Sequence, residues 1–306
     1  MISNFSREYL EQCIKLASSP KKKLILSVHQ TSNSINSAPY TLPPRITKDF
    51  LVCGICNLEE DESVSIARKY YLEIDYFLVD LEKKGYVGSS KESSNLVTGN
   101  LEKRLMEFLN KKKILGIRYD ALTAEHMLNL LIKENPFLYQ LKIGLIGLGK
   151  IGFKISQSLL ECGNNIEIYS RNYEKLYKKC TCMDIIKPES TMARPIPHRT
   201  LEACLAGKDI IITATNSMEV ITLKHLNLIK KGAKLYSIGH GELSQNLINS
   251  LRINEDFSAY RVDIGLSIIQ YVERLIFSKE VKPKYSYKHG EKLVSGGCFG
   301  LSGDLV

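Results

Sequence analysis

The chain has 306 residues, of which 44% are hydrophobic and 25% charged, the composition of a globular protein with room for two domains. This composition excludes wholesale disorder. No run of roughly 18 apolar residues occurs, and the N-terminal sequence lacks the apolar segment of a secretory signal peptide. We therefore expect a cytoplasmic protein with no membrane partner.

Basic residues outnumber acidic residues by 42 to 33, which gives a formal net charge of +9. Lysines cluster at residues 21–23 and 111–113, but no aromatic residues are interleaved with them, so we expect no nucleic-acid partner. Solvated surfaces and attraction for phosphorylated ligands are the better explanations of the charge. The eight cysteines lack the spacing of a disulfide framework, which predicts reduced thiols. Cys53/Cys56 and Cys180/Cys182 are spaced like metal ligands, but no histidine pair accompanies them, so we expect no bound metal.

Residues 1–120 are predicted to form an N-terminal α/β domain that holds the substrate. Short apolar runs at 24–29, 51–56, 75–81 and 114–120 alternate with polar or helix-like segments, as strands and helices do in this class. The segments 32–44 and 85–100 are rich in Ser, Gly, Asn and Pro and are predicted to be loops. His29 ends the first run and is a candidate catalytic residue, with an ordinary loop histidine as the alternative.

Residues 121–136 are predicted to form a hinge helix, because apolar residues recur at helical spacing until Asn135 and Pro136 end the pattern. Asp120 directly precedes this helix. It is a candidate for holding a substrate hydroxyl or ammonium group, or for orienting a histidine. The alternative is that Asp120 only caps the helix, since aspartate is a favoured N-cap residue.

Residues 137–255 are predicted to form a Rossmann dinucleotide-binding domain with a doubly wound parallel sheet. The sequence LKIGLIGLGKIGFKISQSLL contains a strand, a GxGxxG turn and a helix, and a second strand follows. In this motif the first glycine permits a tight turn, the second lets the backbone approach a pyrophosphate, and the third allows close packing of helix on strand. The predicted cofactor-binding residues of the turn are Gly147, Leu148, Gly149, Lys150, Ile151 and Gly152. A glycine-rich turn without a ligand is the alternative.

The choice of cofactor is predicted from the end of the second strand, where a carboxylate would hold the 2′-hydroxyl of NAD. Ser170, Arg171 and Asn172 occupy this place instead. A hydroxyl group beside a guanidinium group suits a 2′-phosphate, so we expect NADP, with NAD as the alternative. The opposing interpretation is that Arg171 is an ordinary surface charge.

Two later strands are predicted to end at the same edge of the sheet. Residues 209–216 form a strand that ends in small polar residues, and Thr215 and Asn216 are predicted to contact the cofactor. Residues 233–238 form another strand, which ends at Gly239 and His240. His240 is the first candidate catalytic residue, because an imidazole can transfer a proton at neutral pH. The alternative is a histidine that only hydrogen-bonds a loop carbonyl.

The segment DIIITATNSMEVITLKHLNLIKKGAKLYSIGHGEL resembles the S-adenosylhomocysteine hydrolase family, with a strand that ends in threonines and a later strand that ends in Ile-Gly-His. The segment RYDALTAEHM also resembles the entry to that family's hinge helix. The resemblance covers about residues 115–245. It implies that Gly239 and His240 lie between a bound NAD and the substrate, and that Asp120 binds the substrate.

The order of a small α/β domain, a hinge helix and GLGKIG is also similar to that of a wider set of two-domain NAD(P)-dependent dehydrogenases, such as the dehydrogenase-like component of dipicolinate synthase. Residues 256–306 are predicted to form a helix that returns to the first domain and a glycine-rich tail. The sequence thus predicts an NADPH-linked reductase of a carbonyl or imine in a small, amino-acid-derived metabolite, acting as a homodimer. A thioether hydrolase or lyase with bound NAD and a non-catalytic nucleotide sensor or scaffold are the alternatives.

Overall fold

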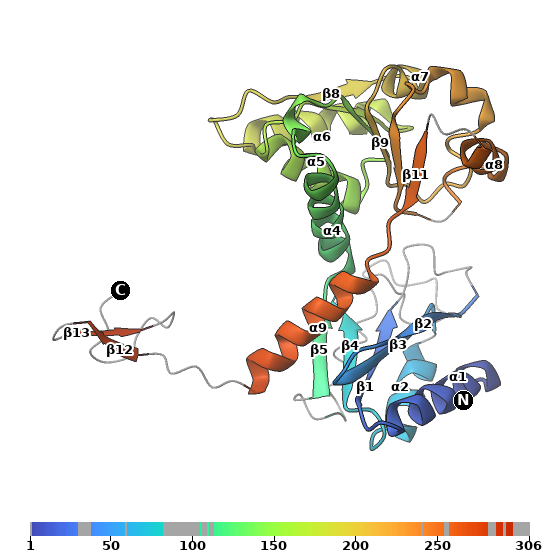
Figure 1. The fold of residues 1–306 in the computed structure, drawn as a ribbon, viewed down its shortest axis with the longest axis vertical. Coiled ribbons are helices and arrows are strands. Elements are labelled where there is room, and N and C mark those ends of the chain that lie inside the picture. The colour runs from blue at the N-terminus through green and yellow to red at the C-terminus, as the bar shows by residue number, and fades with distance from the viewer. Residues whose placement is uncertain are drawn as a thin grey trace, which may run out of the picture. The chain divides into compact units, whose positions relative to one another are not determined.

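The computed structural model describes residues 2–29, 38–58, 60–81, 105, 109, 113–239, 241–253, 257–280, 286–289 and 292–295. Two compact units divide the chain, residues 1–267 and residues 268–306. The first unit contains two separate β-sheets, both built mainly of parallel strands and both covered by helices (Figure 1). The predicted α/β class is confirmed.

The first sheet has five strands among the described residues, in the order β2-β3-β1-β4-β5. They are β1 (Lys23–His29), β2 (Tyr40–Ile46), β3 (Phe50–Cys56), β4 (Tyr76–Asp80) and β5 (Ile114–Ile117). Strands β1, β3, β4 and β5 are parallel to one another and correspond to the four predicted apolar runs. Helices α1 (Asn4–Ser18) and α2 (Glu60–Lys69) cover one face, where Leu10 and Ile66 pack in one cluster with Leu26.

Strand β2 corrects the prediction of a loop over residues 32–44. It runs antiparallel to β3 at the edge of the sheet, and its register shifts between Leu42 and Arg45. Pro43 and Pro44 occupy this irregularity. Proline has no N–H group to donate to a ladder, so it is confined in sheets to edges and bulges, and a sequence pattern with two prolines looks like a loop. The other predicted loop, residues 85–100, lies outside the described residues.

The predicted hinge helix is α4 (Tyr119–Glu134), which begins two residues before the expected boundary. It packs along α5 (Lys150–Glu161) of the second sheet. Met127 and Leu131 are fully buried in the same apolar cluster as Ile155. At its first residue, the hydroxyl of buried Tyr119 lies 2.5 Å from Ser27 Oγ of β1, and burial raises the Tyr119 pKa. The helix is therefore fixed by side chains at its start and along its length.

The second sheet has six parallel strands among the described residues, in the order β11-β10-β9-β6-β7-β8. They are β6 (Ile143–Ile146), β7 (Ile166–Tyr169), β8 (Pro195–His198), β9 (Ile210–Thr213), β10 (Lys234–Ser237) and β11 (Ser258–Arg261). The chain order along the sheet reverses between β6 and β9. This is the strand order of a Rossmann fold, in which ligands bind at the carboxyl ends of the strands at the reversal.

Helices cover both faces of this sheet, as the doubly wound prediction requires (Figure 1). One face carries α4, α5 and α6 (Tyr173–Ile186), and Leu145 of β6 packs there. The opposite face carries α7 (Leu201–Leu205), the 3₁₀ helix η4 (Leu223–Leu228) and α8 (Gln245–Ile253), and Ile146 packs there. Adjacent residues of one strand thus enter different cores, because side chains alternate across a sheet.

Strand β11 extends the Rossmann sheet beyond residue 255, where the sequence analysis placed the end of the domain. Its four residues pair with β10, and three of the four are exposed. A short strand with exposed side chains lacks the apolar signal on which the prediction depended. The sequence therefore carries no sign of β11, nor of β8 at the opposite edge, which contains two prolines.

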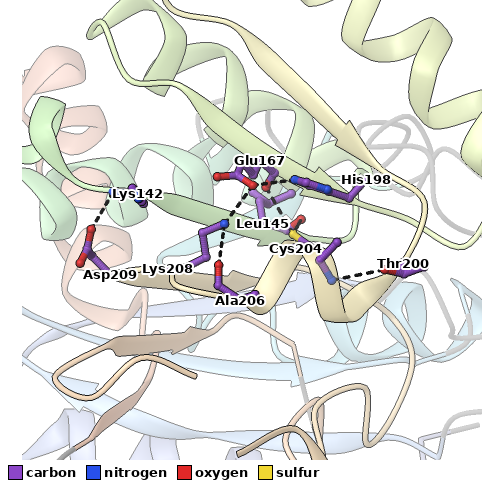
Figure 2. A network of polar contacts seen from close by, with 10 residues as sticks. Lys142, Leu145, Glu167, His198, Thr200, Cys204, Ala206, Lys208 and Asp209 are labelled. Atoms are coloured by element: carbon purple, nitrogen blue, oxygen red, sulfur yellow. Dashed lines mark hydrogen bonds and ion pairs between the residues drawn. The ribbon is translucent and has the colours of Figure 1, made fainter. Parts of the chain in front are cut away.

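A polar network fastens β7 and β8 to the loop before β9 (Figure 2). The Glu167 carboxylate accepts hydrogen bonds from His198 Nε2 at 2.6 Å and from Lys208 Nζ at 2.9 Å. The Cys204 thiol of α7 lies 3.5 Å from the carbonyl oxygen of Glu167, and Lys208 also donates to the Ala206 carbonyl at 2.8 Å. His198, the last residue of β8, thus has a structural partner in Glu167 of β7.

The second compact unit contains most of α9 (Gly265–Glu280) and the antiparallel hairpin of β12 (Ser286–His289) and β13 (Lys292–Ser295). The return of the C-terminal helix to the first domain stays a prediction. Within the described ranges, none of the helices combines the length and the apolar character needed to span a bilayer.

Candidate functional site

The glycine turn has the geometry that the motif predicts. Gly147 follows β6 with φ = +100°, a region that side chains disfavour, and its N–H donates to the Tyr169 carbonyl at 2.8 Å. A Cβ atom on Gly147 would lie 2.5 Å from the carbonyl oxygen of Ala214, and one on Gly152 would clash with the carbonyl oxygen of Gly147. The first and third glycines of the motif are thus required by the backbone itself.

Gly149 is different, because it faces open space. In the part of the chain that the structure describes, no heavy atom beyond Gly149 and the residues next to it in the chain lies within 4 Å of the place that a Cβ would take. Gly149 is the N-cap of α5 and provides no side-chain hydrogen bond to the first turn. Backbone N–H groups at such a helix end attract anions. The residues present therefore fit a pyrophosphate.

The remaining residues of the turn divide between the core and the surface. Leu148 is buried and Ile151 packs against the same cluster, so any contact of these two with a cofactor is through the backbone. Lys150 is exposed at the first position of α5. The Leu148 carbonyl accepts a hydrogen bond from the Lys179 ammonium of α6. Partial burial of this ammonium, followed by repulsion from Lys175, lowers the Lys179 pKa.

A hollow of about 630 Å³ opens beside Gly149. It is lined by Arg118, Asp120, Gly149, Lys150, Phe153, Lys154 and Lys179. Asp120 is 7% exposed, and its carboxylate forms an ion pair with Lys154 of α5 and lies 3.9 Å from Arg118 Nε. The interpretation of Asp120 as the N-cap is wrong, because α4 begins at Tyr119 with Arg118 as its N-cap. Sequence reasoning missed Lys154, which shares one side of α5 with Lys150.

The turn after β7 carries the predicted adenosine-binding residues. Arg171 is exposed, whereas Asn172 has a structural role, since its Oδ1 accepts the N–H of Lys175 at 2.9 Å and caps α6. Ser170 is half-buried between the strand and this cap. The guanidinium of Arg199 lies 4.1 Å from the ring centre of Tyr173, the next residue of the turn. Two guanidinium groups are thus available near one turn.

Arg199 was missed by sequence reasoning, and the signal that points to it is the strand register. Tyr169 of β7 pairs with His198 of β8, so Ser170 and Arg199 leave the sheet at the same edge. Nearby is a hollow of about 360 Å³. It is lined by Tyr169, Arg199, Thr200, Leu201, Glu202, Glu219, Val220, Thr222, Lys224 and His225.

A buried carboxylate organises the ends of β9 and β10. Glu242 is 0% exposed and accepts hydrogen bonds from four donors among the described residues. The donors are Thr213 Oγ1 at 2.7 Å, Thr215 N at 2.5 Å, Ser237 Oγ at 2.9 Å and Gly239 N at 2.7 Å. An ionised carboxylate has acceptor sites for all of them. Glu242 therefore ties the two strand ends together where Thr215 and Gly239 were predicted to line the cofactor.

Gly239 is glycine because its surroundings leave no room for a side chain. A Cβ there would lie 2.7 Å from the Thr215 carbonyl oxygen and 2.8 Å from the carboxyl carbon of Glu242. Thr215 Oγ1 donates to the Ser217 carbonyl at 3.2 Å, and Asn216 is exposed. Sequence reasoning missed Glu242, although an acid two residues after an Ile-Gly-His strand end was available as a signal.

The two candidate catalytic histidines are not tested by the structure. His240 lies outside the described residues, immediately after Gly239. His29 is the last residue of β1, and only its backbone is described. Of the predicted catalytic set, the structure therefore places the side chain of Asp120 alone, beside the glycine turn.

Comparison with known proteins gives one family match. The sequence model of the shikimate/quinate 5-dehydrogenase family matches residues 130–234, from the second half of α4 to the first residue of β10. Comparison with curated protein sequences found no match. The family match supports the predicted NAD(P)-dependent oxidoreductase class, and it gives no support to the resemblance to S-adenosylhomocysteine hydrolase.

Three enzymes are among the solved structures whose backbone follows a path similar to that of this chain. A dipicolinate synthase polypeptide from Bacillus halodurans has 12% identity and a TM-score of 0.43, over 85% of this chain and 98% of that chain. A shikimate dehydrogenase in complex with NADP⁺ has 15% identity and a TM-score of 0.46, and the match covers 85% of this chain and 90% of that chain. L-tryptophan dehydrogenase from Nostoc punctiforme has 10% identity and a TM-score of 0.48, and the match covers 83% of this chain and 75% of that chain.

Proposed function

We propose that the protein is an NADP-dependent oxidoreductase that reduces a carbonyl or imine group in a small, amino-acid-derived metabolite. The observation that carries this proposal is the open position beside Gly149, at the uncapped start of α5 and beside the reversal of strand order. A backbone shaped to admit an anion at this place is the feature that dinucleotide-binding domains share. The dehydrogenase family match covers the same segment.

The adenosine end of the cofactor is assigned to the turn after β7. Ser170, Arg171 and Arg199 offer a hydroxyl and two guanidinium groups for a 2′-phosphate, and guanidinium groups recognise phosphates well. The hollow lined by Tyr169 and Val220 takes the adenosine. The stacking of Arg199 on Tyr173 holds the guanidinium in place without using its hydrogen-bond donors.

The nicotinamide end is assigned to the ends of β9 and β10, where Thr215 and Gly239 are held by Glu242. The bound cofactor supplies the hydride for the reduction. The proton that must accompany the hydride is assigned to His240, whose ordinary pKa suits transfer near neutral pH. Asp120 and its partner Lys154 lie beside the glycine turn and bind the substrate.

The test is a calorimetric titration of the purified protein with NADP⁺ and with NAD⁺, after a check of denatured supernatant for copurified nucleotide. We expect exchangeable binding of NADP⁺ that is at least about tenfold tighter than that of NAD⁺, as two lost phosphate contacts imply. Arg171→Ala and Arg199→Ala should remove this preference while NAD⁺ affinity stays unchanged. Lys178→Ala, an exposed position on α6, is the matched control.

Two outcomes would overturn the proposal. Tightly retained NAD that survives purification and does not respond to Arg171 would favour the hydrolase-type alternative. Exchangeable NADP⁺ binding without oxidation of NADPH by any carbonyl or imine metabolite would favour the sensor or scaffold alternative. We further propose a cytoplasmic homodimer, and light scattering on the purified chain tests its mass.

A further inference from the structure

We propose that the hollow beside α5 binds an acidic group of the substrate, a carboxylate or a phosphate, through Arg118 and Lys154. This inference rests on the proposed function and adds the chemical class of the substrate. The observation behind it is the charge that lines the hollow. Its described residues include the cations Arg118, Lys150, Lys154 and Lys179 and the single carboxylate of Asp120, a net charge of +3 from four cations and one anion.

A hollow with an excess of positive charge attracts anions, because low-dielectric walls concentrate its field. Its volume of about 630 Å³ lies within the range of small-molecule sites. Phe153 contributes an apolar wall to the same space, against which the carbon skeleton of a metabolite can pack. Charge, volume and lining thus suit a small organic acid.

The ion pair with Asp120 prepares Lys154 for this role. The buried carboxylate of Asp120 holds the ammonium at the wall of the hollow. An ammonium group has three N–H donors, so the contact with one carboxylate leaves donors for a ligand. Arg118 lies on the same rim with its side chain 59% exposed, and its Nε is 3.9 Å from Asp120 Oδ1. Its guanidinium fork can therefore turn toward a ligand.

The position of these groups separates them from the pyrophosphate site. Arg118 and Asp120 belong to the start of α4, outside the strand-turn-helix unit that receives the dinucleotide. The backbone N–H groups at Gly149 serve the pyrophosphate, whereas Lys154 lies one turn along α5 from Lys150. We therefore assign the second anion to the substrate.

The experiment is a calorimetric titration of the full chain with inorganic phosphate, with and without saturating NADP⁺, at an ionic strength held constant with chloride. We expect saturable phosphate binding that persists when NADP⁺ is bound. Arg118→Gln and Lys154→Gln should each weaken it about tenfold, as loss of a charge-assisted contact predicts. Lys178→Gln, at an exposed position outside the hollow, should leave it unchanged.

Lys154→Gln leaves the buried Asp120 carboxylate without its cation, so this variant can lose stability as well. Lys154→Arg retains the charge and should retain phosphate binding, and the exposed Arg118 can be replaced without disturbing the core. If NADP⁺ displaces phosphate competitively, the hollow is part of the cofactor site and the inference is wrong. Equal phosphate binding by all variants also overturns it, since it would show an adventitious ion only.

Failure of this inference is distinguishable from failure of the proposed function. The same samples report NADP⁺ binding independently of phosphate binding. A protein that binds NADP⁺ but shows no phosphate site at Arg118 keeps the proposed function and loses only the substrate class. A protein that binds phosphate at Arg118 but no NADP⁺ loses the proposed function.

Discussion

The Oε2 atom of Glu242 lies 2.7 Å from the Thr213 hydroxyl, which joins the loop after β10 to the last residue of β9. The two residues are 29 positions apart in the sequence. One carboxylate thereby sets the shape of two neighbouring strand ends at the edge where Rossmann domains bind their ligands. The edge is held by buried polar contacts as well as by the sheet ladder.

Replacement of Glu242 by alanine should destabilise the protein and distort this edge. It leaves the buried hydroxyl groups of Thr213 and Ser237 without their acceptor, and each such group costs about 1–3 kcal/mol. We expect the free energy of unfolding, measured with urea, to fall by about 3 kcal/mol. NADP⁺ affinity measured below the unfolding transition should fall as well. Glu189→Ala, an exposed substitution, is the control, and an unchanged urea midpoint for Glu242→Ala would contradict the role.

The glycines of the turn should respond to alanine in opposite ways. A Cβ on Gly149 meets no described atom within 4 Å, and the residue has φ = −76°, which alanine adopts readily. Gly149→Ala should therefore keep the melting temperature and weaken NADP⁺ binding at least about tenfold, because the methyl group enters the pyrophosphate space. Gly152→Ala should lower the melting temperature, because its Cβ would clash with the Gly147 carbonyl. Normal NADP⁺ binding by a folded Gly149→Ala variant would place the pyrophosphate elsewhere.

His225 should make the protein less stable at mildly acidic pH. It is 4% exposed, and its Nδ1 accepts the N–H of Thr222 at 3.0 Å, which only the neutral ring can do. Burial and then the charge of Lys224 lower its pKa below 6.5, against the opposing effect of Glu202. A histidine whose pKa is depressed by folding contributes stability above its unfolded pKa, and this stability is lost as the pH falls through the folded value.

The measurement is the melting temperature between pH 5 and pH 8, compared between the wild type and His225→Asn. Asparagine offers an oxygen near the place of Nδ1 and does not titrate. The melting temperature of the variant should therefore fall less than that of the wild type below about pH 6.5. Burial also lowers the pKa of His126, and the charge of Asp263 opposes this effect. His126→Asn should therefore remove a separate part of the fall in melting temperature at acidic pH. Identical pH profiles for the wild type and His225→Asn would refute the assignment.

The cysteines should divide into reactive and unreactive thiols. In the described part of the chain, the thiols of Cys162 and Cys182 are exposed and the other five cysteines are buried. Burial raises the pKa of Cys204 to about 12 and that of Cys180 to about 11, so both remain thiols at neutral pH. Brief treatment with iodoacetamide should label Cys162 and Cys182 first, as mass spectrometry of peptides can show. Labelling of Cys204 as fast as Cys162 in the native protein would be inconsistent with this structure.

Much of the fold was predictable because its signals are local. The GLGKIG turn imposes a conformation that glycine alone adopts at Gly147, and the apolar runs of the parallel strands stand out in the sequence. Strands β2, β8 and β11 were missed because they lie at sheet edges, where prolines and exposed side chains are tolerated. Edge strands depend on a neighbour for their structure, and a neighbour distant in sequence leaves no periodic signal.

The site was predictable only in part for a related reason. Backbone-determined positions such as Gly149 and the turn at Arg171 follow from a motif. Lys154 and Arg199 take their roles from contacts across helices and strands that no spacing in the sequence reveals. Glu242 follows the Ile-Gly-His strand end by two residues, but its four hydrogen bonds appear only in the folded chain. Asn172 shows the opposite case. The motif predicted that it binds the cofactor, but its side-chain oxygen caps α6 by accepting the N–H of Lys175.

The prolines of two edge strands limit how copies of this chain can associate. β2 carries Pro43 and Pro44 at its bulge, and β8 carries Pro195 and Pro197 within four residues. Each proline removes an N–H donor from an edge that could otherwise pair with a strand of another molecule. Neither edge presents a continuous row of donors. A strand of a second copy would therefore find gaps in the hydrogen-bond ladder at β2 and β8, and these two edges are guarded against aggregation.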